Sequence, residues 1–154
     1  MKIRILAVGR KASGWVADAE KDYVKRLSHS ADISCELVAP EDEHSLGAKA
    51  AAAKESAGLL ARCRPGDFLL ACDRRGNACS SEELAAELRT MQDSGAKICF
   101  VIGGSHGLTE EVLGKASRTV SFSHLTFPHE LFRIMLLEQL YRAFTIIAGK
   151  KYHK

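Results

Sequence analysis

The glycine loop Ile102-Gly103-Gly104-Ser105-His106-Gly107 follows directly on the apolar run Lys97 to Ile102 and precedes Thr109, a residue that can cap a helix. A short apolar run that ends in glycines and leads into a helix is typical of α/β domains. In open α/β sheets, ligands bind just beyond the carboxyl ends of the strands. The loop therefore predicts both a fold class and the place of a ligand site.

Apolar runs and amphipathic segments alternate along the whole chain. Five strands are expected, at residues 3–8, 33–37, 68–72, 97–102 and 119–123. Five helices are expected, at residues 15–27, 46–64, 80–94, 109–116 and 128–148. Residues 40–47 are expected to form a charged loop, and Asp73 to Asn77 a polar turn. This alternation predicts a single α/β domain over residues 1–154, with a parallel sheet and helices on both faces.

Composition is that of a soluble globular protein. The 154 residues are 46% hydrophobic and 27% charged, and no apolar run approaches the roughly 20 residues needed to cross a bilayer. We expect a cytoplasmic protein that does not bind membranes. The net charge of +3 permits an acidic partner without requiring one. The five cysteines form no C-x-x-C pair and the six histidines are scattered, so we expect reduced thiols and no metal.

The last expected helix is apolar on nearly every side. Its polar residues, among them Glu130, Arg133 and Glu138, are spread around the helical wheel instead of sharing one face. A sheet can cover only one face of such a helix, and the remaining apolar surface would be larger than monomers usually expose. The pattern therefore predicts a homodimer that uses this helix.

Three segments are expected to lie side by side at the carboxyl ends of the strands: residues 72–76, 103–107 and 123–128. The pair Gly103-Gly104 permits close approach of backbone amides to a ligand, although a glycine turn is also needed for geometry alone in many folds. The chain has no phosphate-binding G-x-x-x-x-G-K-[ST] sequence and no G-x-G-x-x-G after the first strand. These patterns favour a nucleoside ligand without phosphates.

The carboxyl terminus, Tyr152-His153-Lys154, places an aromatic ring, an imidazole and an ammonium group directly after the apolar helix. Such residues suit stacking on a base and contact with a phosphate. On composition alone, a disordered tail is equally consistent with this sequence. No Ser-His-Asp order, catalytic cysteine context or paired carboxylates stand out, so hydrolytic chemistry has little support.

Several motifs occur together in a characteristic order: the glycine loop, the segment 121–129, Arg133, the segment 138–143 and the terminal Tyr-His-Lys. They closely resemble the bacterial ribosomal RNA large subunit methyltransferase H family over essentially the whole chain. The resemblance implies a minimal SPOUT-class methyltransferase, homodimeric, with a C-terminal trefoil knot. It further implies methyl transfer from S-adenosylmethionine to N3 of a pseudouridine in 23S ribosomal RNA, on the assembled ribosome and without DNA as a partner.

The resemblance also implies site residues. The methyl donor would be bound by Cys72, Gly103, Gly104, Phe122, Ser123, His124, Leu125, Thr126 and Phe127. On the acceptor side, His153 would act as base or orienting group, Tyr152 as a stacking platform and Lys154 as a contact to phosphate or developing charge. Relatives often have leucine in place of Cys72. Lys154 keeps a positive charge but lacks the bidentate fork of the arginine found in some of them.

Two other interpretations stay open at this point. One is a non-catalytic α/β module that binds the ribosome. The other is an unrelated nucleotide-using α/β enzyme. Binding of S-adenosylmethionine distinguishes the methyltransferase from both.

Overall fold

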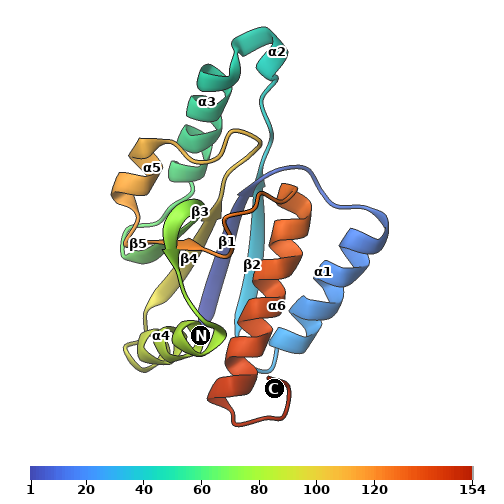
Figure 1. Ribbon diagram of the computed structural model, residues 1–154, viewed down its shortest axis with the longest axis vertical. Helices are drawn as coiled ribbons and strands as arrows, with labels where there is room; N and C mark the ends of the chain where they lie inside the picture. The colour runs from blue at the N-terminus through green and yellow to red at the C-terminus, as the bar shows by residue number, and fades with distance from the viewer. Residues whose placement is uncertain (154) are drawn as a thin grey trace.

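The computed structural model describes residues 1–153 as a five-stranded parallel sheet with helices on both faces (Figure 1). The strands are β1 (Lys2–Val8), β2 (Asp32–Val38), β3 (Asp67–Ala78), β4 (Lys97–Ile102) and β5 (Arg118–Ser121). The helices are α1 (Gly14–Leu27), α2 (Glu43–Leu46), α3 (Ala48–Leu60), α4 (Ser81–Asp93), α5 (Glu110–Lys115) and α6 (His129–Ile147). The strand order is β2-β1-β4-β3-β5, so the predicted parallel α/β sheet is confirmed.

Two apolar cores lie on the two faces of the sheet. Helices α1, α4 and α6 cover one face, where Phe100 and Leu140 are fully buried. Helices α3 and α5 cover the other, where Leu59 and Val112 are fully buried. The central strands β1 and β4 are apolar along almost their whole length because both of their faces are covered. Their carboxyl ends therefore have fixed positions, from which the glycine loop and its neighbours extend.

Two predicted irregular segments have regular structure. The charged loop expected at residues 40–47 contains the one-turn helix α2, because the Asp42 side chain accepts a hydrogen bond from the backbone N–H of His44 and caps it. The polar turn expected at residues 73–77 is part of β3, which continues to Ala78. There the register shifts, so that both Cys72 and Asn77 pair with Val120 of β5.

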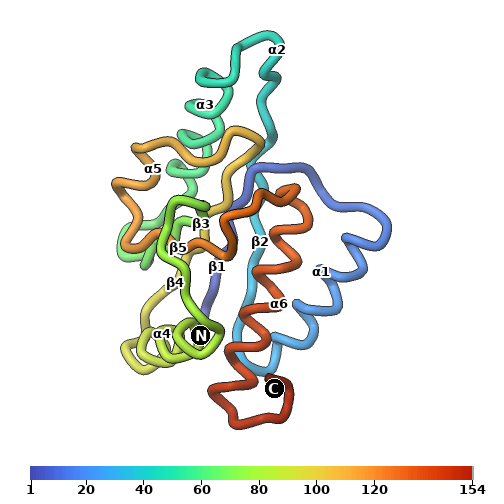
Figure 2. The backbone as a smooth tube through the Cα atoms, in the orientation of Figure 1, coloured from blue at the N-terminus to red at the C-terminus, as the bar shows by residue number. Residues whose placement is uncertain are grey.

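Gly76 makes this close approach of β3 to β5 possible. A Cβ atom on Gly76 would lie 2.7 Å from the backbone carbonyl carbon and oxygen of Thr119, far inside normal contact. In Figure 2 the later part of β3 passes close to β5. The segment between Cys72 and Asn77 thus departs from β5 and returns to it within a few residues, a path that hydrophobic periodicity does not reveal.

Helix α6 is covered within one chain more fully than its sequence indicates. Helices α1 and α4 pack on its two flanks while the sheet lies behind it (Figure 1). Among the described residues, the exposed large hydrophobic side chains are Trp15, Leu46 and Leu125, and none belongs to α6. None of the large apolar side chains of α6 is fully exposed, but Leu131, Phe132 and Met135 are half-buried, so the neighbouring helices reduce the expected apolar face without removing it. The homodimer itself stays a prediction.

All five cysteines are free thiols, as expected, and Cys72 and Cys99 serve as small buried residues of the sheet. Within residues 1–153, none of the helices is long and apolar enough to span a bilayer.

Candidate functional site

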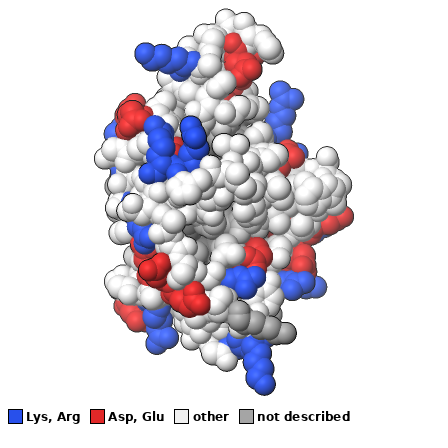
Figure 3. All heavy atoms as spheres, in the orientation of Figure 1, with Lys and Arg blue, Asp and Glu red and all other residues white. Residues whose placement is uncertain are grey.

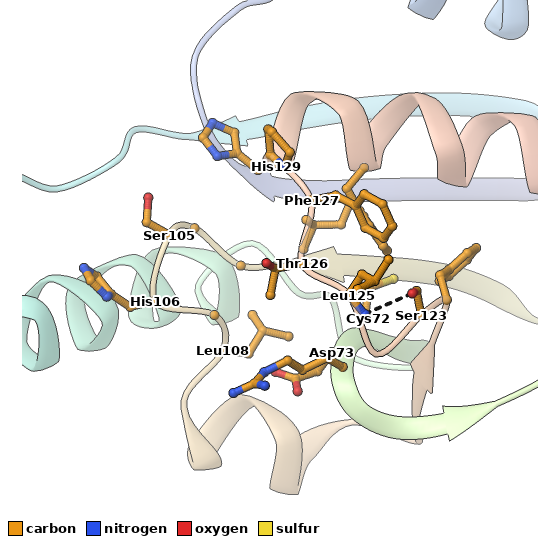
Figure 4. A pocket seen from close by; sticks show the side chains of 18 of the residues that line it. Cys72, Asp73, Ser105, His106, Leu108, Ser123, Leu125, Thr126, Phe127 and His129 are labelled. Carbon is orange, nitrogen blue, oxygen red and sulfur yellow. Dashed lines mark hydrogen bonds between the residues drawn. The ribbon is translucent and has the colours of Figure 1, made fainter.

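The three segments that the sequence places at the carboxyl ends of the strands meet in one cavity of about 670 Å³ (Figure 4). Its walls come from the second half of β3, from the residues after β4 and β5, and from the first turn of α6. Small-molecule sites usually have volumes of about 300–1,000 Å³. The cavity is therefore large enough for a nucleoside-sized ligand.

The glycine loop forms one wall because it folds tightly on itself. The N–H of Gly107 donates to the carbonyl of Gly104 at 3.0 Å, and Gly107 has a φ of +73°, a conformation that favours glycine. A Cβ atom on Gly103 would lie 2.5 Å from the carbonyl carbon of Gly107. Only glycine at position 103 allows this loop shape, so the turn exposes backbone instead of side chains to the cavity.

Helix α3 supports the loop from behind. The Ser56 hydroxyl accepts a hydrogen bond from the N–H of Thr109 at 3.2 Å. The buried Glu55 carboxylate accepts one from the N–H of Glu41 at 3.0 Å, while its second oxygen would lie 2.6 Å from a Cβ on Gly104. Gly104 is therefore required for packing against Glu55. The alanine-rich sequence around Glu55 gave no sign of this role, since buried carboxylates have no sequence signature.

An ion-pair network borders the cavity at the end of β3. Arg75 donates to Asp73 through both its backbone N–H and its Nε, each at 2.9 Å, and also reaches the carbonyl of Leu108 at 3.1 Å. Burial by itself raises the pKa of Asp73, but these hydrogen bonds and the charge of Arg75 bring it below its ordinary value. Asp73 is thus an anion at neutral pH. It fixes Arg75 across the mouth of the cavity, from β3 to the start of α5.

The segment before α6 forms the opposite wall. The Ser123 hydroxyl accepts a hydrogen bond from the N–H of Leu125 at 3.0 Å (Figure 4). The Ser121 hydroxyl donates to the carbonyl of Ser123 at 3.1 Å. This turn holds the Leu125 side chain 71% exposed at the cavity. A large apolar side chain exposed to water beside a cavity can pack against the apolar surface of a bound ligand.

Eight of the nine predicted donor-site residues line this cavity: Cys72, Gly103, Gly104, Phe122, Ser123, Leu125, Thr126 and Phe127. His124 is exposed and is not part of the wall. Leu108, His129 and Phe132 also line it, although the sequence analysis did not assign them to the donor site. Phe132 lies one turn into α6 and could have been found from its helical spacing to Pro128. Burial raises the pKa of the Cys72 thiol, with a further contribution from Asp73, so Cys72 is a neutral wall residue.

The described part of the predicted catalytic tail lies outside this cavity in the same chain. The Tyr152 hydroxyl donates to Glu138 at 3.2 Å, and the Nε2 atom of His153 lies 2.7 Å from a carboxylate oxygen of Glu82. Glu138 is at the middle of α6 and Glu82 is in the first turn of α4, whereas the cavity is at the amino end of α6 (Figure 1). The stretch of helix from His129 to Glu138 is about 14 Å long. Neither Tyr152 nor His153 lines the cavity of its own chain, and Lys154 lies outside the described residues.

Aromatic and ionic contacts order the described part of the tail. The Tyr152 ring packs edge-on against Tyr141 with centroids 4.9 Å apart, and the Arg142 guanidinium lies 5.0 Å from the centre of the Tyr152 ring. Burial and then the nearby Glu138 carboxylate raise the pKa of Tyr152 to about 12. Tyr152 is consequently a neutral hydrogen-bond donor at physiological pH. A disordered tail is excluded for these residues.

The fold and the site define an α/β domain of the kind found in known methylases. The structure is similar to a probable methylase family protein from Haemophilus influenzae, with a TM-score of 0.59 and 20% sequence identity over 99% of this chain and 70% of that one. It is also similar to a probable methyltransferase from Bordetella pertussis, with a TM-score of 0.54 and 16% identity over 92% of this chain and 95% of that one. At these identities the likeness concerns the fold alone.

Sequence comparison is more specific. The family described as "Predicted SPOUT methyltransferase" matches residues 1–153. The chain is 46% identical to the ribosomal RNA large subunit methyltransferase H of Pelotomaculum thermopropionicum over 98% of both proteins, and 41% identical over full length to that of Anaeromyxobacter dehalogenans. The chain therefore belongs to the SPOUT methyltransferases, and within them to the ribosomal RNA large subunit methyltransferase H family.

Proposed function

We propose that this chain transfers a methyl group from S-adenosylmethionine to N3 of a pseudouridine in 23S ribosomal RNA of assembled ribosomes in the cytoplasm, with residues 1–154 acting as one domain. The observation that carries the proposal is the meeting of the three predicted segments in one cavity. The names of the relatives, which are ribosomal RNA methyltransferases of the large subunit, support the choice of acceptor.

The cavity fits a sulfonium nucleoside. Its glycine loop folds on itself because Gly103 lacks a Cβ, so the loop presents backbone groups that can approach a planar ligand closely. Leu125 and Phe127 offer apolar surface to the ligand. We assign donor binding to the wall residues named above. When bound, S-adenosylmethionine supplies an electrophilic methyl group attached to a positively charged sulfur.

Methyl transfer to N3 requires that nitrogen to lose its proton and to be aligned with the methyl group, with reacting atoms about 3–3.5 Å apart. We assign the acceptor side to Tyr152, His153 and Lys154. The Nε2 atom of His153 lies 2.7 Å from a Glu82 carboxylate oxygen; with the proton on Nε2, Nδ1 is an acceptor, and an Arg142 nitrogen lies 3.5 Å from it. Displacement of Arg142 by the acceptor base would free Nδ1 to take the N3 proton.

The separation of tail and cavity supports a homodimer with composite sites. Within one chain, neither Tyr152 nor His153 lines the cavity, and about 14 Å of helix lies between His129 at the cavity and Glu138, the partner of Tyr152. A two-fold dimer with antiparallel α6 helices would bring the tail of one chain to the cavity of its partner. A groove of about 570 Å³ along α6, lined by Tyr23, Leu84 and Met135 among others, supports contact at this surface.

The trefoil knot is part of the same proposal. Pairing of both Cys72 and Asn77 with Val120 means that β3 wraps closely around β5, with Gly76 against the backbone of Thr119. A knot requires that the chain pass through a loop formed by another of its segments, and this close turn of β3 would serve as part of such a loop. Resistance of the 118–128 segment to hydrogen exchange, beyond that of the other loops, would support threading.

The surface suits docking on a folded ribonucleoprotein. The net charge is only +3, and basic and acidic side chains are interspersed over the face seen in Figure 3. A protein of this charge gains less from bulk counterion release than a binder of naked RNA, so it depends more on shape and on a few basic contacts.

Calorimetry with S-adenosylmethionine tests the donor half of the proposal, and mass spectrometry of 23S ribosomal RNA from cells lacking the protein tests the acceptor half. We expect binding by the wild-type protein and one missing methyl group in the mutant cells. Truncation after Lys151 should leave donor binding intact and abolish methylation. Binding of ribosomes without binding of S-adenosylmethionine would instead favour the non-catalytic ribosome-binding module.

A further inference from the structure

Arg133 is a buried cation whose hydrogen-bonding capacity is largely unused. Its side chain is 1% exposed, and its Nε donates to Glu20 of α1 at 2.7 Å. Neither Nη1 nor Nη2 has a hydrogen-bond partner among residues 1–153. Buried N–H groups without acceptors cost free energy, and the cost is larger for a charged group. The two Nη groups therefore present a fork suited to two oxygens of a carboxylate or a phosphate.

The first turn of α6 adds further unused donors at the same place. No side chain caps this helix, so the backbone N–H groups of His129, Glu130 and Leu131 lack acceptors within the described chain. Side chains on a helix lean toward its amino end, and residues four apart share a face. Arg133 therefore extends back along α6 on the face of His129, toward the end where the helix dipole favours negative charge. Glu130 is the one acid in that turn.

Gly9 connects this group to the donor cavity. A Cβ atom on Gly9 would lie 3.0 Å from Nη1 of Arg133 and 3.1 Å from the ring of His129, and His129 lines the cavity. The segment after Gly9 has no regular structure and carries Arg10 and Lys11, which are exposed and form no ion pair in the described part of the chain. The unused N–H groups of Arg133 thus lie directly behind His129 in the cavity wall, close to the basic segment that follows Gly9.

We infer that Arg133 and the first turn of α6 form an oxyanion-binding subsite behind His129. It takes either the carboxylate of the methyl donor or a backbone phosphate of the acceptor RNA. This inference rests on the proposed function and adds a ligand contact to it. In the free protein the subsite is closed by Gly9 and His129, so ligand entry requires the His129 ring or the segment 10–13 to shift.

Inorganic phosphate tests the subsite independently of methyl transfer. Because an anion bound only by the folded state raises stability, phosphate should raise the melting temperature of the wild-type protein. Glu20→Gln removes the acid that pairs with Arg133 in the described chain and should enlarge this phosphate-dependent shift, whereas Arg133→Gln should abolish it. Arg89→Gln, at an exposed arginine paired with Asp93 on α4, serves as the matched control and should retain the wild-type shift. Equal shifts in all four proteins would mean that ordered water satisfies Arg133, and would overturn the inference.

If Arg133→Gln does not fold, the phosphate test uses Arg133→Lys, which keeps the charge but loses the fork, together with Glu20→Gln.

Two measurements then identify the source of the anion. With the donor carboxylate as ligand, Arg133→Lys weakens S-adenosylmethionine about tenfold but not methylthioadenosine, which lacks that group. With an RNA phosphate as ligand, both affinities are unchanged and KM for ribosomes rises about tenfold. No change in either measurement would contradict a ligand role. Absence of donor binding by the wild type would contradict the proposed function alone.

Discussion

Substitution of Gly103 by alanine tests whether the shape of the glycine loop creates the cavity. A Cβ at this position would lie 2.5 Å from the carbonyl carbon and 2.6 Å from the carbonyl oxygen of Gly107. Carbon atoms in normal contact are about 3.5–4.0 Å apart, so the added methyl group would overlap fixed backbone by about 1 Å. Because the obstacle is main chain and not the end of a flexible side chain, the loop itself must move.

The expected cost follows from two contributions. Overpacking in a well-ordered region costs about 1–3 kcal/mol. Opening of the loop also weakens the 3.0 Å hydrogen bond from Gly107 to Gly104, a loss of about 1 kcal/mol. Gly103→Ala should therefore lower the free energy of unfolding by about 2–4 kcal/mol.

Gly114→Ala is the matched control, because a Cβ at this position in α5 meets nothing within 4 Å. Alanine is favoured over glycine in a helix interior by about 1 kcal/mol, so this variant should be as stable as the wild type or more so. Urea unfolding of both variants measures the difference, and calorimetry with S-adenosylmethionine should show affinity lost only in Gly103→Ala. Alanine variants that differ by less than about 1 kcal/mol and bind the donor equally would refute this account of the loop.

Two further predictions concern charged groups. Arg4 is buried and pairs with Asp67 at 2.8 Å, so Arg4→Met should cost about 3 kcal/mol in urea unfolding by leaving a buried carboxylate unpaired, and adding Asp67→Asn should recover part of this loss. The lowered pKa of Asp73 means that its carboxylate stabilises the fold above its unfolded pKa of about 3.9, and that this contribution is lost as the pH falls through the lower folded value. Asp73→Asn should therefore be destabilised by about 1 kcal/mol at pH 7 and match the wild type once the pH is below the folded pKa of Asp73. A destabilisation that does not change with pH would show that the Asp73 charge is not responsible.

The sheet and most of the cavity could be predicted from sequence because both depend on local patterns. Apolar runs of strand length and the capping residues between them identify the elements, and parallel strands end at one edge, so residues 72–76, 103–107 and 123–128 had to meet. The expected α4 illustrates this well: the Ser80 and Glu83 side chains form the reciprocal capping box that their spacing predicts.

The features that sequence patterns missed depend on contacts between distant segments. The continuation of β3 past Cys72 exists because Asn77 finds a partner in β5, although Asp73 to Asn77 contains the residues of a turn. The cover of α6 depends on how α1 and α4 pack, which helical periodicity does not specify. Burial of Glu55 and Arg133 could not be predicted from the sequence either, because charged residues in helices are mostly exposed.

The geometry of α6 makes a prediction about which chain supplies each half of the active site. The cavity lies at the amino end of this helix, whereas Tyr152 packs against Glu138 at its middle and does not line the cavity, so we expect a site that needs both to combine two chains. Leu125→Arg, at a side chain that is 71% exposed, should block the cavity and repel a sulfonium cation without disturbing the core. Neither this variant nor the truncation after Lys151 should methylate ribosomes alone.

Mixed dimers of these two inactive chains distinguish a shared site from a site within one chain. If tail and cavity come from different subunits, each mixed dimer contains one intact site, formed by the tail of the Leu125→Arg chain and the cavity of the truncated chain. Random pairing makes about half of the dimers mixed, each with one of its two sites intact, so about a quarter of wild-type activity should return. If each tail served its own cavity, every site in the mixture would be defective. Because the contacts of Tyr152 and His153 hold the tail outside the cavity of its own chain, we expect the activity to return.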